Sequence, residues 1–415
     1  MKHRRLIIGY IMLVWFVISF VTNLIGPLMP IIIHDFKLSL GLAGFLPFSF
    51  FLAYGLISIP AGTLVEAKGS RFTMQVAFAL NLLGSAIIAL KPGYATAVAG
   101  LFVIGLGMAM LQVVINPLTR VAGGEEHFAF FSVMGQLVFG FASFVSPLVF
   151  EWLMERPGAA GQPLVWVTFY WAFTALFFAL IGSTAKLPLP RVELKEDEKG
   201  GGLSTYLELL ARRDVKLFFL GIVAYVGTEQ TLADWMSQFL ATYHHFSPTA
   251  EAADAVGHFW GLMSVGCVLG LLLLKLFDAQ RVLAAFTVLA VGCVSLALFG
   301  PAQVSLQAFA FAGFFLSVMF SVVFSLGLNS VPKHHGALSG ILCTGILGGA
   351  IVPLLVGMLG DQLGLRAAMS VVYLTLGFIF SIAFWARPLI RNETVSLGAL
   401  LGQIKFGAKV DPREP

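Results

Sequence analysis

The chain has 415 residues, of which 58% are hydrophobic and only 11% are charged. A soluble domain is about 25% charged, so these charged side chains are too few to cover a water-facing surface of this size. The composition therefore excludes a soluble globular protein, and the abundance of apolar side chains excludes a disordered one. The net charge of +4 does not indicate nucleic-acid binding, because the basic residues lie between apolar runs and not in one patch.

Apolar runs long enough to cross a bilayer recur along the whole chain. A membrane-spanning helix needs about 20 apolar residues. Twelve candidate runs are present: 6–33, 41–65, 73–90, 94–119, 128–150, 163–185, 217–243, 255–274, 282–300, 302–329, 336–360 and 367–386. The sequence therefore predicts an all-α membrane protein with twelve transmembrane helices. The first run is too long for a cleaved signal peptide, so we expect it to be retained.

The spacing of these runs predicts two halves. Residues 1–187 form an N-terminal six-helix half and residues 216–388 form a C-terminal six-helix half. Residues 188–215, which are rich in charge and glycine, are expected to form a cytoplasmic linker. Residues 389–415 form a tail with one short interfacial helix near 395–406.

The lysine and arginine positions predict the orientation, because cytoplasmic loops carry an excess of basic residues. With the N-terminus inside, 21 of the 25 basic side chains fall on the cytoplasmic side and 4 on the outer side. Both termini are then cytoplasmic, in a plasma membrane or a bacterial inner membrane. The three cysteines all lie in apolar runs, so neither a disulfide framework nor a metal cluster is expected.

An internal repeat is marked by acidic residues at the ends of the second, fifth, eighth and eleventh helices. They are Glu66, Glu151, Asp278 and Asp361, and corresponding positions in the two halves are 212 and 210 residues apart. The first and last sites share the pattern Gly-x-x-x-acid-x-x-Gly-x-Arg, as Gly62, Glu66, Gly69 and Arg71, and as Gly357, Asp361, Gly364 and Arg366. Three helices per unit is an odd number, so the two sites face opposite sides of the membrane. The pattern predicts inverted three-helix repeats.

Two carboxylates, Glu229 and Asp234, lie within an apolar run. A charge at mid-bilayer costs about 2.5 to 3.5 kcal/mol on insertion scales, and such residues usually face a cavity. Glu229 lies near the middle of its helix, beside Gly227 and Thr228, where a small-residue break would let a substrate approach the backbone. We expect Glu229 to be a coupling or substrate-contact residue and Asp234 to be solvated near the outer end.

The other polar residues at depth suit a neutral, hydroxyl-rich solute, because amides both donate and accept hydrogen bonds and aromatic rings pack against a sugar's apolar face. The expected binding residues are Glu229, Asn23, Gln112, Asn116, Gln136, Gln230, Tyr225 and Trp235. For each single amide, interhelical hydrogen bonding is the alternative.

The twelve helices in two halves and the segment from Gly62 to Arg71 resemble the major facilitator superfamily. This resemblance implies that Gly62, Glu66, Gly69 and Arg71, with Asp361 and Arg366 as their outer counterparts, lock and release the two halves. The family pattern has Asp where Glu66 stands.

Further stretches resemble the fucose-galactose-glucose:proton symporter family. They are Asn23-Leu24, Asn116-Pro117, Gln136, the run Tyr225-Val-Gly-Thr-Glu229 with Trp235, and the glycine-rich run from Ser339 to Pro353. Members of that family carry carboxylates in helices 1 and 4, where this sequence has Gly26 and Gln112. The resemblance therefore implies that coupling, if present, uses Glu229.

These observations together predict a secondary transporter for a small polar solute, with a sugar as the expected substrate and a proton or sodium ion as the coupling ion. We expect no other cofactor, no metal, no nucleic-acid partner and a monomer in the lipid bilayer. Export of a lipophilic drug or lipid and uncoupled sugar uniport are the alternatives. An enzyme is not expected, because no Walker loop, HExxH or Gly-x-Ser-x-Gly occurs in a usable context. A receptor would need a larger cytoplasmic domain.

Overall fold

The computed structural model describes residues 4–123, 128–156, 158, 162–189, 203–332 and 334–389. Within these ranges the secondary structure is helical, with no β-strand. The expected helix near 395–406 lies outside the described residues.

The first half contains seven helical segments for six predicted runs. They are α1 (Arg4–Thr22), α2 (Ile25–Phe36), α3 (Leu40–Lys68), α4 (Ser70–Leu90), α5 (Tyr94–Gly123), α6 (Phe128–Met154) and α7 (Val167–Lys186). The predicted first helix is divided, because the chain turns at Asn23 and Leu24 between α1 and α2.

The second half contains the remaining segments, and three of its predicted runs are also divided. They are α9 (Arg213–His244), α10 (Glu251–Leu276), α11 (Ala279–Phe299), α12 (Ala302–Leu316), α13 (Met319–Leu328), α14 (His335–Thr344), η2 (Gly345–Leu347), α15 (Gly348–Leu363), α16 (Leu365–Met369) and α17 (Val372–Trp385). The predicted linker contains a short helix, α8 (Leu203–Ala211).

Among the described residues, eleven helical spans are long and apolar enough to cross a membrane, and each corresponds to one predicted run. The remaining predicted run is α9, a continuous helix of 32 residues that carries Glu229, Gln230 and Asp234. Its lower apolar content reflects its place in the bundle, because most of its residues between Val215 and Leu240 are buried against other helices. A helix shielded from lipid by its neighbours can carry polar side chains.

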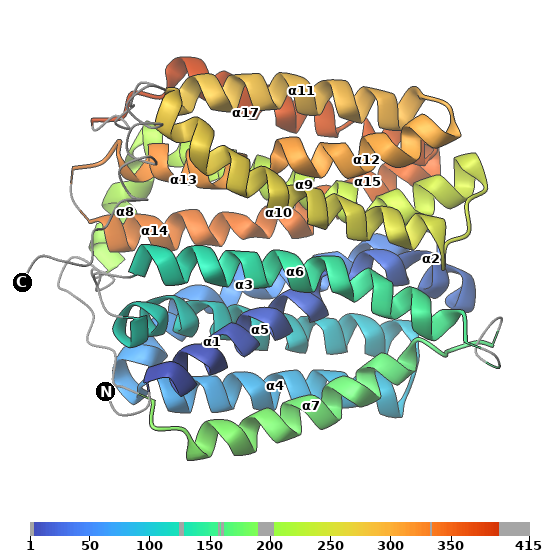
Figure 1. Ribbon diagram of the computed structural model, residues 1–415, viewed down its shortest axis with the longest axis horizontal. Helices are drawn as coiled ribbons and strands as arrows, with labels where there is room; N and C mark the ends of the chain where they lie inside the picture. Colours follow the sequence, from blue (N-terminus) through green and yellow to red (C-terminus); the bar gives the residue numbers. More distant parts are fainter. Residues whose placement is uncertain are drawn as a thin grey trace, which may run out of the picture.

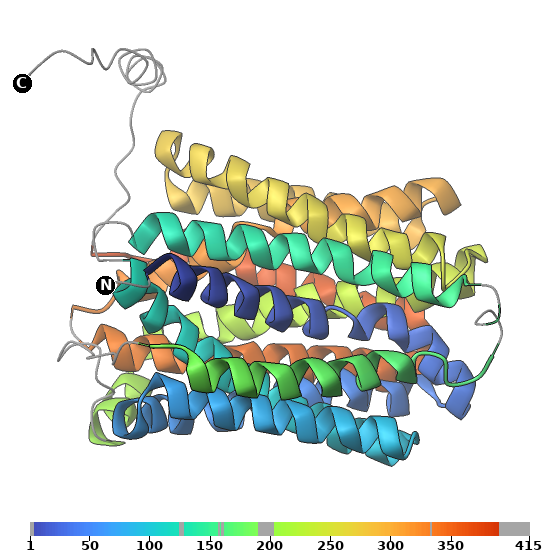
Figure 2. The same ribbon diagram turned by 60° about the horizontal axis from the view of Figure 1, so that its bottom comes forward.

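The helices run along the long axis of the molecule (Figures 1 and 2). The two halves lie side by side, so that the junction between them is parallel to the helices. Contacts between the halves join α3 with α15, α6 with α10, and α2 with α9. The beginning of α1 and the helix α8 lie at the same end of the bundle, at the left of Figure 1. Below, this end is called the α8 end and the opposite end the far end.

Candidate functional site

The carboxylate of Glu229 lies in the central part of α9 and is held by two neighbours on the same helix. The Tyr225 hydroxyl donates a hydrogen bond of 2.7 Å to Glu229 Oε1, and Gln230 Nε2 lies 3.5 Å from Oε2. Residues four apart share a helix face, which explains the tyrosine contact. Tyr225 and Gln230 are buried, whereas Glu229 is only half-buried. Glu229 therefore keeps acceptor capacity for a further ligand, since a carboxylate has about four lone-pair sites.

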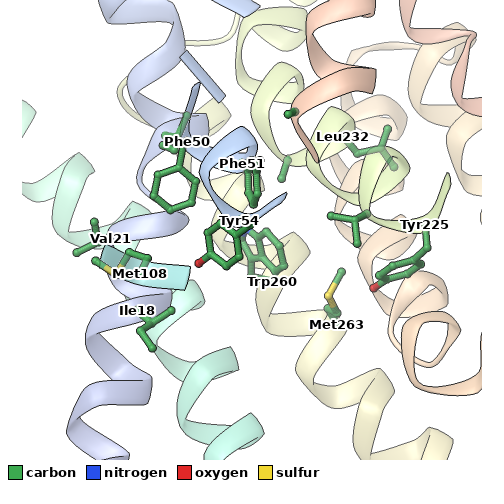
Figure 3. Close-up of a cluster of buried hydrophobic side chains, with 14 of the residues drawn as sticks. Ile18, Val21, Phe50, Phe51, Tyr54, Met108, Tyr225, Leu232, Trp260 and Met263 are labelled. Carbon is green, nitrogen blue, oxygen red and sulfur yellow. The ribbon is translucent and has the colours of Figure 1, made fainter. Parts of the chain in front are cut away.

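Aromatic side chains from both halves surround this part of the molecule. Figure 3 shows Tyr54 of α3 beside Trp260 of α10, and Met263 between Trp260 and Tyr225. The indole N–H of Trp260 is buried and has no hydrogen-bond partner. Cys267, two turns further along α10, is close enough to Glu229 to interact with it electrostatically. The site thus combines a free donor, an acceptor and apolar ring faces.

The amides predicted as binding residues are not gathered at one point. Asn23 is buried, and its Nδ2 donates to Ser19 O at 3.0 Å and to Ser143 Oγ at 2.9 Å, which ties α1 to α6. Gln112 of α5 is half-buried, and Gln136 of α6 is exposed. Asn116 lies in α5, but its side chain is outside the described part of the structure.

Trp235 lies away from the accessible part of the site. Its side chain is fully buried, and Nε1 donates a 3.0 Å hydrogen bond to the Pro353 carbonyl of α15. Gln230 also faces α15, because an added Cβ on Gly349 would lie 3.0 Å from Gln230 Cγ. Trp235 therefore joins two helices of one half.

The expected break of α9 at Gly227 and Thr228 is wrong, because α9 is continuous through both residues. An added Cβ on Gly227 would contact Val352 and would lie 3.2 Å from Gly348 O. Thr228 Oγ1 bonds to Ala224 O of its own helix and to Thr375 of α17. The small residues serve close helix packing.

The expectation that Asp234 is solvated is also wrong. Its exposed fraction is 3%, and its Oδ2 has no hydrogen-bond partner. The residue lies on α9 where α2 packs closely against that helix, and this packing excludes water.

The copy of the repeated motif at the far end connects the two halves. Asp361 at the end of α15 accepts hydrogen bonds from the backbone N–H groups of Leu40, at 2.7 Å, and Gly41, at 2.8 Å. Ser39 Oγ accepts from Leu42 N in the same turn. The N-terminus of a helix has unpaired N–H groups and a partial positive charge. The carboxylate of one half therefore caps a helix of the other half.

The copy of the motif at the α8 end makes a different contact. The guanidinium of Arg71 donates to the Leu187 carbonyl, at the end of α7 in the same half. Gly69 and Gly364, at equivalent positions of the two copies, both have positive φ angles, 84° and 80°. Such a backbone favours glycine, which explains the glycine at this position. The Glu66 side chain is outside the described part.

The other two acidic positions of the repeat have separate roles. Asp278 Oδ1 accepts from Gln280 N at 2.9 Å and caps its own helix, α11. Glu151, at the end of α6, lies within electrostatic range of Asp254 of α10. The four positions therefore share a place at helix ends but not one type of contact.

Contact between the halves is tight at the far end and decreases toward the α8 end. Along α3, an added Cβ would lie 3.1 Å from Leu354 at Gly44 and 3.2 Å from Leu347 at Gly55, but would meet nothing within 4 Å at Gly62. Gly62 is two turns beyond Gly55 on the same helix face. On α6, Gly140 contacts Ser264, whereas Gln136, one turn further, is exposed. The two halves are thus in close contact at the far end, and their contact becomes looser toward the α8 end.

Several residues of this site escaped prediction from the sequence. Tyr54 and Met263 lie in helices whose apolar runs give no functional signal, and only the packing brings them together (Figure 3). The hydroxyl group of Tyr54 within a mostly apolar run is the feature from which the sequence could have indicated this residue.

The family of the chain follows from comparison with known sequences. The model of the Major Facilitator Superfamily matches residues 11–345. The chain belongs to this superfamily. It is therefore a membrane-embedded transporter. The predictions of a transport function and of a protein that is not an enzyme are confirmed by this membership.

Two curated relatives cover most of the chain. A glucose/galactose transporter of Brucella abortus is 29% identical over 386 residues, which cover 88% of this chain and 90% of that protein. The L-fucose-proton symporter of Escherichia coli is 26% identical over 393 residues, which cover 88% and 89%.

Solved structures confirm the predicted fold. The E. coli fucose:proton symporter has a TM-score of 0.64 with 22% identity over 91% of this chain and 98% of that chain. A D-xylose-proton symporter has a TM-score of 0.74 with 13% identity over 94% and 99%. The twelve-helix architecture in two halves is thus established.

Proposed function

We propose that this transporter moves a neutral sugar of hexose type between the two sides of the membrane by alternating access. The observation that carries the proposal is the half-buried Glu229 carboxylate, held by Tyr225 and Gln230, in the same part of the molecule as the unpartnered indole N–H of Trp260. The relatives named for glucose, galactose and fucose support this substrate class.

The chemistry of the site matches a sugar. Glu229 accepts hydrogen bonds from sugar hydroxyls, and such bonds to a charged group contribute about 1.5 to 3 kcal/mol each. The Trp260 N–H donates to a hydroxyl or ring oxygen, and the rings of Tyr54 and Trp260 cover an apolar face of the sugar. Gln112 and Gln136 supply further amides on the open side. Asn23 and Trp235 act as positioning residues that keep their helices in place.

The orientation completes the proposal. With the basic residues on the cytoplasmic side, the α8 end faces the cytoplasm and the far end faces outward. The described conformation is then open to the cytoplasm. The chain divides into the halves 1–187 and 216–388 around a cytoplasmic linker, with both termini inside. A single cysteine at Lys37 should react only with an external reagent and one at Lys68 only with an internal reagent, in a background with Cys267, Cys293 and Cys343 replaced.

Binding measurements test the substrate class. Glucose, galactose and fucose are titrated against the purified protein, with tryptophan fluorescence and calorimetry as readouts. We expect saturable binding of at least one sugar and a loss of about 10- to 100-fold for Glu229→Gln, because a neutral amide accepts more weakly. Glu208→Gln, at an exposed position of α8, is the matched control and should bind normally. Binding of hydrophobic cations without any sugar would favour lipophilic export instead.

Transport measurements test the mode. Reconstituted vesicles are loaded under imposed proton or sodium gradients, and accumulation of labelled sugar is followed. Uphill accumulation under one gradient identifies the coupling ion, whereas equilibration without accumulation under either gradient identifies a uniporter.

A further inference from the structure

Asp234 is a second buried acid, separate from the substrate site. It lies five residues beyond Glu229 on α9, about 7.5 Å along the helix axis at 1.5 Å per residue. Its exposed fraction is 3%, and Oδ2 has no partner. A charged carboxylate in such surroundings is strongly disfavoured unless it is paired.

The charged and titratable groups around this part of α9 do not pair with Asp234. On the neighbouring helices they are His34, Asp35, Glu251, Asp254, His258, Asp361, Arg366 and Tyr373, and on α9 itself Glu229, Tyr243 and His244. Asp35 accepts from Trp166, Glu251 from Ser247, and Asp361 from Leu40 and Gly41. Asp254 lies 3.2 Å from His258, Arg366 stacks on Tyr243, and Tyr373 contacts Ser295.

The remaining titratable groups on helices that pack against α9 lie nearer its α8 end. They are Cys267 and Lys275 of α10, His335 and Cys343 of α14, and Tyr206 and Glu208 of α8. Cys267 interacts with Glu229, and Tyr206 lies against Gly340. Among the described residues, no counter-ion for Asp234 is therefore present on any helix packed against α9.

Asp234 lies at the junction between the two halves. Gly26 of α2 touches the Ala233 carbonyl, and an added Cβ on Gly26 would lie 3.5 Å from Asp234 Cα. Thr231 Oγ1 and Ser237 Oγ, one turn before and one turn after Asp234 on α9, are also buried without partners. Three unpartnered polar groups on consecutive turns indicate a site that meets other partners, such as water, when α2 and α9 separate.

We propose that Asp234 is the proton-loading group of the outer gate, so that the gate closes only when Asp234 carries a proton. When α2 and α9 are apart, the carboxylate meets outside water and takes up one proton there. Closure then buries the neutral carboxyl. The proton later passes from the Asp234 oxygen to water on the α8 side, and the ionised carboxylate left behind favours reopening of the gate. This inference rests on the proposed ion coupling and assigns the gating proton to a residue other than the substrate contact.

The gate itself provides the first test. Spin labels at Lys37 and Leu363, which are exposed in the two halves at the far end, report its opening by double electron-electron resonance without any sugar. We expect the closed fraction to rise at least fivefold from pH 9 to pH 5. In Asp234→Asn the gate should be closed at every pH, and in Asp234→Glu the closed fraction should again depend on pH. Glu208→Gln, the matched control at the exposed acid of α8, should keep the pH dependence.

Protonation of another acid at the gate, Asp361, is expected to change the closed fraction in the opposite direction. Protonation of Asp361 would weaken its bonds to α3 and favour opening as pH falls, so the measurement is repeated in Asp361→Asn. A gate that opens in acid, shows no pH dependence, or retains its pH dependence in Asp234→Asn overturns the inference.

Sugar-driven proton entry provides the second test, measured with a pH dye inside vesicles. Asp234→Asn should lose proton entry while counterflow exchange of sugar persists, because exchange needs no change of protonation. Normal proton entry in this variant overturns the inference even if the sugar substrate is confirmed. Absence of any sugar transport by the unmodified protein contradicts the proposed function instead, and the gate measurement still decides the role of Asp234.

Discussion

The two copies of the repeated motif lie at opposite ends of the junction between the halves and make different contacts. At the far end, Asp361 crosses the junction and caps α3 at Leu40 and Gly41. At the α8 end, Arg71 bonds to Leu187 of its own half, and Gly62 meets no neighbour. Among the described side chains, which exclude Glu66, the shared pattern therefore makes a contact between the halves at the far end and none at the α8 end. We propose that the Asp361 copy acts as a latch between the halves in this conformation.

The largest effect is expected from removing the engaged latch. Asp361→Ala deletes two hydrogen bonds to helix N–H groups, and bonds of this kind to a charged group contribute about 1.5 to 3 kcal/mol. The closed fraction at the far end should fall by about 10- to 100-fold, measured as a longer distance between labels at Lys37 and Leu363. An unchanged distance would show that packing alone holds this end.

A second, intermediate effect is expected from a methyl group at the tight end. In Gly357→Ala the new Cβ would lie 2.5 Å from Leu40 O and 3.0 Å from Trp235, and overpacking typically costs about 1 to 3 kcal/mol. The far end should open several-fold in the same distance measurement. In Gly62→Ala, the equivalent change in the other copy, the new Cβ would meet nothing within 4 Å. The closed fraction at the far end should therefore change by less than about twofold. Equal effects of the two changes would contradict the inference that the halves pack more tightly at the far end than at the α8 end.

The smallest effect is expected from the arginines that end each copy. Arg71 bonds to Leu187 of its own half, and Arg366 stacks on Tyr243, with its centre 4.5 Å from the ring, also in its own half. Neither contact crosses the junction. Arg71→Gln and Arg366→Gln should therefore change the closed fraction by less than about twofold, although exposed cation–π contacts contribute about 0.5 to 1 kcal/mol to stability. A large shift in either variant would place an arginine in the latch.

The site shows how far prediction from the sequence reached. The sequence indicates Glu229 because a charged residue within a membrane-spanning run is energetically costly and usually functional. The structure gives this carboxylate two hydrogen-bonding neighbours on its own helix. Asn23, selected by the same logic, bonds to Ser19 and Ser143 within one half. An amide at depth is costly wherever it lies, so its presence alone does not separate a binding residue from an interhelical bond.

The sequence by itself determined the twelve helices, their division into two halves and the repeated motif, because apolar length and residue spacing are properties of the chain alone. Only the tertiary structure decided that Gly227 packs a helix, that Asp234 is buried and that Tyr54 and Trp260 meet. These outcomes depend on which faces of separate helices come together, and the angle and depth of that contact are set by the packing of the whole bundle.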